Sequence, residues 1–134
     1  MTSNSTQSSA DGDTITYDYD RDVDILYISF VPGEKATAAV ELNENILLRF
    51  NLTERRAVGL TLMDYSVLVQ PAALGRRHFP LTGLRDLEPD WEEVVLELLA
   101  APPVSRILTV AAFSTSANET IPIVAIENPI AVAG

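Results

Sequence analysis

Hydrophobic and polar residues alternate with a period of two over most of residues 14–66, and this is the period of β-strands. The strongest strand candidate covers residues 23–31, which are rich in β-branched and aromatic side chains and stop at Pro32-Gly33. Its alternating apolar side chains fall on two faces, Leu26, Ile28 and Phe30 on one and Ile25, Tyr27 and Val31 on the other. Because both faces are largely apolar, we expect this strand to be central in a sheet and covered on both sides.

Further segments with strand character surround this one. They are residues 15–17, 37–42, 46–52 and 58–63, separated by polar or charged turns at 18–22, 43–45 and 53–56. Parallel pairing needs a crossover of about a dozen residues or more. Connections this short therefore predict antiparallel strands that pair in sequence order, which is a β-meander.

After residue 66 the hydrophobic period becomes that of a helix. Pro89 fits a first helical position, acidic residues follow it in the first turn, and Pro102-Pro103 ends the segment. One apolar stripe runs along about three turns and consists of Trp91, Val94, Val95, Leu98 and Leu99. Residues 71–75 fit a single helical turn before this helix, and residues 76–80 fit a loop.

Two apolar runs at residues 106–113 and 120–127 flank a polar loop and predict a β-hairpin, in which Pro122 belongs at a sheet edge or a bulge because it has no N–H to donate. The patterns together predict an α+β fold: an antiparallel β-meander of about five short strands packed on one amphipathic helix, with a C-terminal β-hairpin. We expect one domain at residues 14–128, between a disordered tail at 1–13 and a second tail at 129–134. Its parts are the meander (14–66), a loop and helix (67–103) and the hairpin (104–128).

Composition narrows the classes of function. With 19 acidic and 9 basic residues the formal net charge is −10, which disfavours nucleic acid and anionic membranes as partners. The chain has no cysteine, so it has neither disulfides nor thiolate metal ligands. No apolar run approaches the ~20 residues of a membrane span, and residues 1–13 lack the pattern of a signal peptide. We expect a cytoplasmic protein.

The clearest candidate for a metal site is an array of aspartates. Asp18, Asp20, Asp22 and Asp24 alternate as D-x-D-x-D-x-D, and clustered carboxylates are the ligands that calcium prefers. The pattern of a calcium loop is nevertheless incomplete, since neither its central glycine nor its final glutamate is present. The array therefore favours a solvated acidic turn, and the sequence leaves open whether it binds any cation.

Few other polar groups are candidates for a site. His78 is the only histidine, and the adjacent Arg76 and Arg77 oppose its protonation, so a surface or structural role is favoured over a general base. The two arginines are suited to an acidic partner or a phosphate, although adjacent loop arginines are usually solvated. Alternation places Asp64 inward with Leu60 and Leu62, and a cap of the following turn is favoured over a binding role. We predict no catalytic residue, no cofactor and no metal site.

Several short motifs along the predicted meander form a recognisable set. They are Tyr17-Asp18, Asp24-Ile25-Leu26-Tyr27-Ile28, Asn45-Ile46-Leu47-Leu48, Val58-Gly59-Leu60-Thr61-Leu62 and Asp64-Tyr65-Ser66. This set resembles the YuzE-like bacterial family, domain of unknown function 2283, over about fifty residues. The resemblance implies a small antiparallel sheet backed by a helix, without an established activity. Some relatives look like one half of toxin–antitoxin-style gene pairs.

Two hypotheses of function follow. The favoured one is a non-enzymatic interaction or oligomerisation module that uses the second face of the sheet, at Ile25, Tyr27, Leu47 and Met63, to contact another protein or a second copy of the chain. The resemblance adds a small toxin-like protein as a possible partner. The alternative is a small-ligand-binding protein or enzyme with a pocket between sheet and helix, using Asp64 and Arg76 as polar groups.

Overall fold

The computed structural model describes the backbone of residues 3–10, 13–70, 77–116 and 119–127, and the side chains of 15–70, 77–112 and 122–127. The chain forms two compact units, one up to Tyr65 and the other from Ser66 on. The predicted α+β class is confirmed: a six-strand antiparallel sheet, one longer helix and a small three-strand antiparallel sheet follow one another along the chain. The expected single domain at residues 14–128 stays a prediction.

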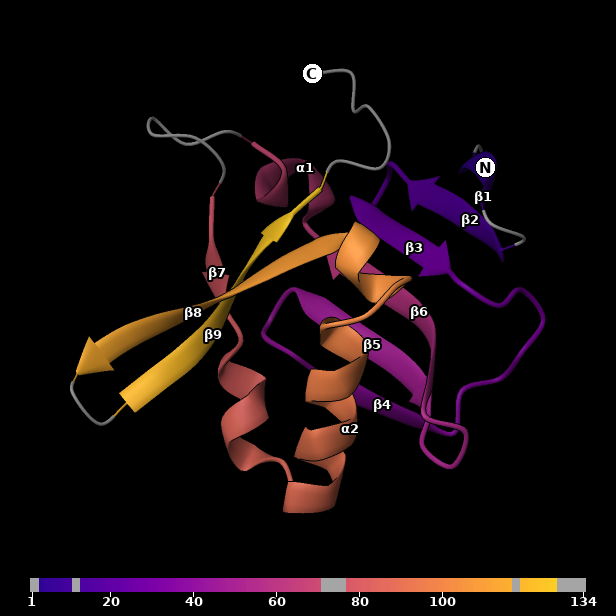
Figure 1. Ribbon diagram of the computed structural model, residues 1–134. Helices are drawn as coiled ribbons and strands as arrows, with labels where there is room; N and C mark the ends of the chain where they lie inside the picture. The colour runs from indigo at the N-terminus through magenta and orange to yellow at the C-terminus, as the bar shows by residue number, and fades with distance from the viewer. Residues whose placement is uncertain (1–2, 11–12, 71–76, 117–118, 128–134) are drawn as a thin grey trace. The chain divides into compact units, whose positions relative to one another are not determined.

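The first unit is built on an antiparallel sheet (Figure 1). Its strands are β2 (Asp13–Asp20), β3 (Ile25–Ser29), β4 (Ala38–Glu41), β5 (Ile46–Asn51) and β6 (Arg56–Met63), and β1 (Ser3–Ala10) pairs with β2 at the edge. We expected residues 1–13 to be a disordered tail, whereas Ser3–Ala10 pairs with β2 through its backbone. Ladder hydrogen bonds use only backbone N–H and C=O groups, so a polar segment can extend an edge in this way.

The strand order corrects the predicted meander. The order is β1-β2-β3-β6-β5-β4, so β3 pairs with β6 and not with the next strand along the chain. Residues 30–37 carry the chain from the end of β3 to the opposite edge of the sheet, where β4 begins. Strands β4, β5 and β6 then pair in sequence order. This connection is of Greek-key type, and it places β3 beside β6.

The two faces of the sheet differ strongly in exposure. One face is buried, and the side chains of Leu26, Ile28, Ile46, Leu48, Phe50, Leu60 and Leu62 are each 0% exposed. On the opposite face Tyr27 is 40% exposed, and Ile25, Leu47 and Met63 are partly exposed. The prediction that β3 is covered on both faces is therefore wrong for the described chain, since only one face is covered completely.

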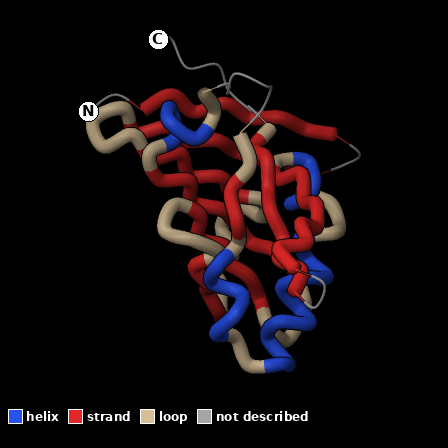
Figure 2. Tube along the Cα trace, turned by 90° about the vertical axis from the view of Figure 1, so that its left-hand side faces the viewer, coloured by secondary structure: helices blue, strands red, loops and turns tan. Residues whose placement is uncertain are grey.

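The second unit contains the helices and the smaller sheet (Figure 2). The short helix α1 (Tyr65–Leu68) crosses the boundary of the units, and β7 (Phe79–Pro80), η1 (Thr82–Asp86), α2 (Pro89–Leu99), η2 (Val104–Arg106), β8 (Leu108–Ser116) and β9 (Glu119–Ile126) follow. Helix α2 begins at Pro89 as predicted, and four of the five stripe residues, Val94, Val95, Leu98 and Leu99, are buried. Residues 71–75, where one helical turn was predicted, lie outside the described residues.

The predicted C-terminal hairpin is confirmed by the pairing of β8 with β9. The sheet order is β7-β9-β8, which makes β9 the middle strand. Strand β7 reaches only Ile123 and Val124, so Pro122 lies just beyond that pairing, where its carbonyl accepts a hydrogen bond from the N–H of Leu81. No helix among the described residues is long and apolar enough to cross a membrane.

Candidate functional site

The pairing of β3, β6 and β5 brings the four predicted contact residues together. Ile25 lies opposite Met63, while Tyr27 and Leu47 lie opposite Thr61 from its two sides. Residues that are paired across neighbouring strands point to the same side of a sheet. Ile25, Tyr27, Leu47, Met63 and Thr61 therefore form one continuous patch, which we call the exposed face.

An arginine that was not predicted lies on the same face. Arg49 is two residues after Leu47 on β5 and is paired with Gly59 on β6. A Cβ atom built on Gly59 would overlap the Nη2 atom of Arg49 and would lie 3.0 Å from its Cζ atom. The guanidinium group of Arg49 therefore lies directly over the backbone of Gly59, in a space that exists because this position has no side chain.

The guanidinium group of Arg49 has no hydrogen bond or ion pair with any described residue. The nearest carboxylate along the ladder belongs to Glu41, which is paired with Leu47 and is diagonal to Arg49. A long side chain can reach a diagonal neighbour on the next strand. The guanidinium of Arg49 nevertheless lies over β6, whereas Glu41 is on β4, on the opposite side of β5. The exposed face thus presents a cation whose hydrogen-bond donors are unused inside the described chain.

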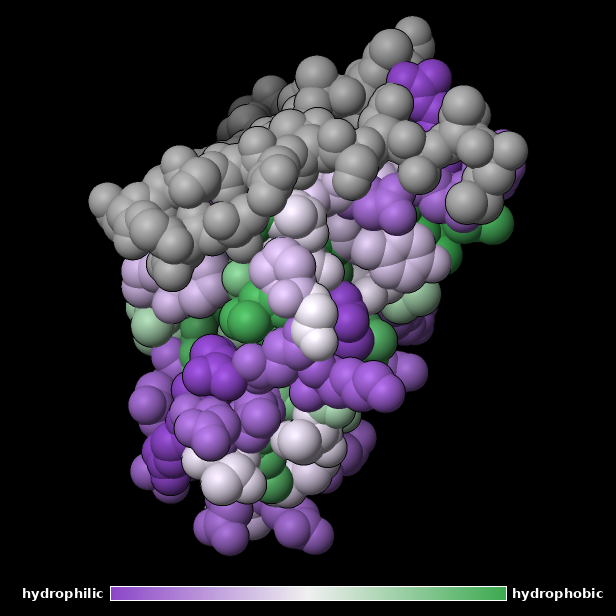
Figure 3. Space-filling view, turned by 90° about the vertical axis from the view of Figure 1, so that its right-hand side faces the viewer, coloured by the Kyte–Doolittle hydropathy of each residue, from purple (hydrophilic) through white to green (hydrophobic). Residues whose placement is uncertain are grey.

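Acidic side chains flank the exposed face on both of its outer strands. Asp18 on β2 is paired with Tyr27, and Glu41 on β4 is paired with Leu47. Both carboxylates are exposed. Figure 3 shows one side of the molecule, on which hydrophobic surface appears as small patches among hydrophilic groups. The arrangement of apolar centre, single cation and acidic edges suits contact with another protein.

A second group of polar residues closes one end of the sheet. Asp24 precedes β3 and Asp64 follows β6, and since Ile25 pairs with Met63 both aspartates lie at the same end of the ladder. Each has a left-handed backbone, with φ of 56°, which aspartate tolerates better than most residues. The carbonyl of Asp24 accepts the N–H of Tyr65 at 3.0 Å, so the end of β6 is tied to the start of β3.

Tyr19 completes this end of the sheet. Its hydroxyl donates a hydrogen bond of 2.6 Å to Oδ1 of Asp24, and its ring packs edge-on against Tyr65 with centroids 5.6 Å apart. Burial, together with the hydrogen bond to the Asp24 carboxylate, raises the pKa of Tyr19 to about 12. Tyr19 therefore stays protonated over the physiological range and acts as a donor that holds Asp24 in place.

The structure corrects the inward orientation predicted for Asp64. Its side chain is exposed, and Oδ2 accepts a hydrogen bond of 3.2 Å from the amide Nδ2 of Asn45. The left-handed backbone at Asp64 ends the alternation of β6, and the next residue, Tyr65, is buried completely. Asn45 also donates to the Met63 carbonyl at 3.1 Å. These contacts give Asp64 a role in closing the sheet.

The predicted basic candidates belong to the second unit, whereas Asp64 belongs to the first. Arg77 donates to the carbonyl of Val67 at 3.3 Å and lies over the ring of Phe79, with Cζ 5.6 Å from the ring centroid. His78 is exposed. Arg76 lies outside the described residues, so the alternative site that requires Asp64 and Arg76 stays a prediction.

The four aspartates of the D-x-D-x-D-x-D array adopt different environments. Asp18 is exposed on β2, Asp20 accepts the backbone N–H of Asp22 at 3.0 Å in the turn, and Asp24 binds Tyr19. Within the described part of the chain, no group of three or more histidine or acidic side chains is arranged to hold a metal ion.

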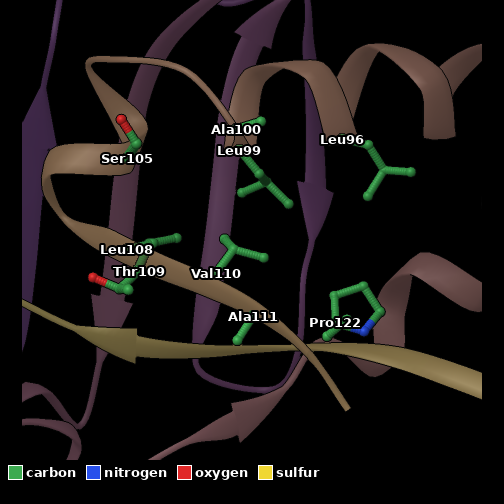
Figure 4. A pocket seen from close by; sticks show the side chains of 10 residues that line it. Leu96, Leu99, Ala100, Ser105, Leu108, Thr109, Val110, Ala111 and Pro122 are labelled. Atoms are coloured by element: carbon green, nitrogen blue, oxygen red, sulfur yellow. The ribbon is translucent and has the colours of Figure 1, made fainter. Parts of the chain in front are cut away.

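The second unit contains an open groove of about 560 Å³ between α2 and η2 on one side and β8 and β9 on the other (Figure 4). Its lining is mainly apolar, and it includes Leu96, Leu99, Leu108, Val110, Ala111 and Pro122. The polar side chains in the lining are Ser105 and Thr109. Both are neutral hydroxyls, so the groove offers an apolar surface without a charged group for acid–base catalysis.

The fold and the closing motif define the class of this protein: a small antiparallel sheet domain of the type predicted from the motifs, with two aspartates, Asp24 and Asp64, at one end of its central strand pair. Residues 16–66 form a domain of the family described as protein of unknown function DUF2283. The matched segment includes the exposed face and ends just after the closing Asp64-Tyr65. A search of curated proteins found no match. A search of solved structures found none either.

Proposed function

We propose that this protein is a non-enzymatic interaction or oligomerisation module and that the exposed face is its contact surface. The observation that supports the proposal most directly is the difference between the two faces of one sheet. Leu26 and Ile28 are 0% exposed, whereas Tyr27, between them in the sequence, is 40% exposed. An aromatic residue that stands among aliphatic side chains in the middle of an exposed surface is the common centre of a protein interface.

The character of the face also supports this function. Ile25, Leu47 and Met63 supply apolar area, while Arg49 supplies donors without a described partner. Tyrosine, methionine and arginine are enriched in interfaces over the rest of a protein surface. The finer proposal for the partner, a small toxin-like protein, comes from the family resemblance and is separate from these physical arguments.

The experiment compares Tyr27→Lys with the wild-type chain. Sedimentation velocity over a wide range of concentrations measures self-association, and the affinity for any protein captured by the wild-type chain measures association with a different partner. Truncating a central aromatic of an interface costs about 2 kcal/mol or more, so we expect association to weaken by at least about thirtyfold. Since Tyr27 is exposed, the free energy of unfolding should change by no more than about 0.5 kcal/mol.

Val23→Lys is the matched control. Val23 is 54% exposed and lies in the turn before β3, outside the exposed face. The Val23→Lys substitution adds the same charge as Tyr27→Lys at another exposed apolar position, and we expect it to leave association unchanged. An association that is equally strong in the Tyr27→Lys chain, or the absence of any association of the wild-type chain, would contradict the proposed function.

A further inference from the structure

We propose that the groove of the second unit binds an extended segment of a partner protein, which adds a fourth strand along the free edge of β8 and packs apolar side chains against α2. The sheet order β7-β9-β8 places β8 at an edge, with no further strand beside it among the described residues. The groove belongs to the second unit and the exposed face to the first. This inference therefore goes beyond the proposed function and does not depend on it.

The groove follows the edge of β8. Its lining includes five consecutive residues of this strand: Leu108, Thr109, Val110, Ala111 and Ala112. Successive side chains of a strand point to opposite faces of a sheet, and one edge of β8 is occupied by β9. A single groove that touches residues of both faces therefore runs along the other edge of the strand.

The hydrogen-bond register shows which backbone groups of β8 point into that edge. The N–H of Glu127 donates to the carbonyl of Ile107 at 2.7 Å, and the next pair along the hairpin joins Leu108 to Ile126. Hydrogen-bonded and non-hydrogen-bonded pairs alternate along an antiparallel ladder. The odd-numbered residues 109 and 111 therefore bond to β9, whereas the even-numbered residues 108, 110 and 112 direct their N–H and C=O groups away from it.

Two prolines in the small sheet agree with this register. Pro122 is paired with Ala112, where no N–H toward β8 is needed, and its carbonyl accepts the N–H of Leu81 at 3.0 Å on the β7 side. Pro80, next to Leu81, is paired with Ile123 and needs no N–H there either. The outward backbone groups of β8 have no partner among the described residues. Another extended backbone offers donors and acceptors at the matching spacing.

The second wall of the groove determines which side chains fit. In Figure 4, Leu96 and Leu99 of α2 face Val110 and Pro122 across the groove. Leu96 is 40% exposed and Val110 is 36% exposed, so both have apolar surface left to cover. Directly paired residues point to the same face of a sheet. The residue of an added antiparallel strand that bonds to Val110 therefore points its side chain toward α2, where an aliphatic group fits.

The charges near the groove select the ends of the segment. The lining itself contains no charged side chain. Glu92 lies one helical turn before Leu96 on α2, and the Glu127 carboxylate accepts a hydrogen bond from the Thr109 hydroxyl at 3.2 Å. Arg106, in η2, is already engaged within the chain. A segment with an aliphatic centre and basic ends therefore complements the groove, and an acidic segment does not.

The first test uses the synthetic peptide acetyl-Lys-Val-Thr-Val-Thr-Val-Lys-amide, with binding measured by calorimetry. In the proposed register the valines face α2 and bond to β8, while the threonine N–H groups point away from β8. N-methylation of the central valine should weaken binding at least about tenfold, since it removes a donor and blocks the approach to the edge. N-methylation of a threonine should change the affinity by only a few-fold. Equal binding of the two methylated peptides, or no binding of the unmethylated peptide at millimolar concentration, would overturn the inference.

The second test changes β8. Val110→Pro removes an N–H that β9 does not use, so the hairpin should persist, which circular dichroism checks, while the peptide binds at least about tenfold more weakly. The matched variant Val110→Ala keeps the N–H and loses only apolar area, and it should weaken binding by no more than a few-fold. Ala112→Pro applies the same test one pair further along should Val110→Pro not fold. Proline variants that bind as tightly as Val110→Ala would contradict strand addition.

Amide hydrogen exchange in the wild-type chain tests the register without any substitution. In the free protein the amide of Val110 should exchange faster than the amides of Thr109 and Ala111, which bond to β9. Saturating peptide should slow the exchange of Val110. An amide of Val110 that is as protected as its neighbours in the free protein, or that the bound peptide leaves unchanged, would place the peptide elsewhere and overturn the inference.

Discussion

At the scale of single residues, Gly59 has a consequence that the alternation of β6 does not reveal. A Cβ atom at this position would lie 2.5 Å from the carbonyl oxygen of Ile28 and would overlap the guanidinium of Arg49. Glycine here allows a close approach of two strands and gives Arg49 a place on the surface of the sheet. The residue thus links the packing of β3 against β6 to the charge on the exposed face.

The first prediction concerns this link. Gly59→Ala should lower the free energy of unfolding by about 1–3 kcal/mol, because an added methyl group in a filled space forces its neighbours to move. In the background of Arg49→Ala the same substitution should cost less, although the Ile28 carbonyl still opposes it. Urea unfolding of the wild-type chain, the two single variants and the double variant gives the coupling energy between positions 49 and 59. Equal costs in both backgrounds would show that Arg49 does not lie over Gly59.

A second residue-scale prediction follows from Tyr19. Its pKa in the folded chain is about 12, above the value of about 10 for an unfolded tyrosine. The folded state holds this proton more tightly, so its stabilisation is present below pH about 10 and is lost as the pH rises from there through about 12. The free energy of unfolding should therefore fall more steeply over this window in the wild-type chain than in Tyr19→Phe. Parallel curves from urea titrations at successive pH values would contradict this.

At the scale of elements, local sequence signals located helix α2 and the strands but did not predict the order in which the strands pair. Pro89 and Pro102 enclose α2, and alternation located the strands of the large sheet, because capping, backbone restriction and side-chain period act within a few residues. The pairing of β3 with β6 was missed because short connections favour sequential pairing, and nothing local in residues 30–37 signals a return on the far side of the sheet.

For the candidate site, too, the sequence predicted what depends on local alternation and missed what depends on contacts with other strands. Ile25, Tyr27, Leu47 and Met63 were grouped correctly, since alternation and the burial of the other face require it. Arg49 was missed because its importance depends on a glycine in another strand, and a glycine within an apolar strand was the one available signal. The orientation of Asp64 was wrong because a left-handed residue at the strand end stops the alternation.

At the scale of the whole molecule, the central claim is that a protein partner covers the exposed face. The chain carries a net charge of −10, and like-charged copies repel over a distance of about 8 Å at physiological salt. Association therefore depends on the local placement of Arg49 and the apolar centre rather than on overall charge. The buried face and the groove of the second unit do not enter this claim.

One measurement tests the claim most directly, and the absence of native cysteine makes it possible. Ser29→Cys places a single thiol on the exposed face with little change in size, and Thr53→Cys places one in the exposed turn after β5. We predict that alkylation of the Ser29→Cys thiol slows when the chain self-associates at higher concentration or binds a captured protein. The Thr53→Cys thiol should react at a constant rate under the same conditions. Association that leaves the Ser29→Cys rate unchanged would contradict the account.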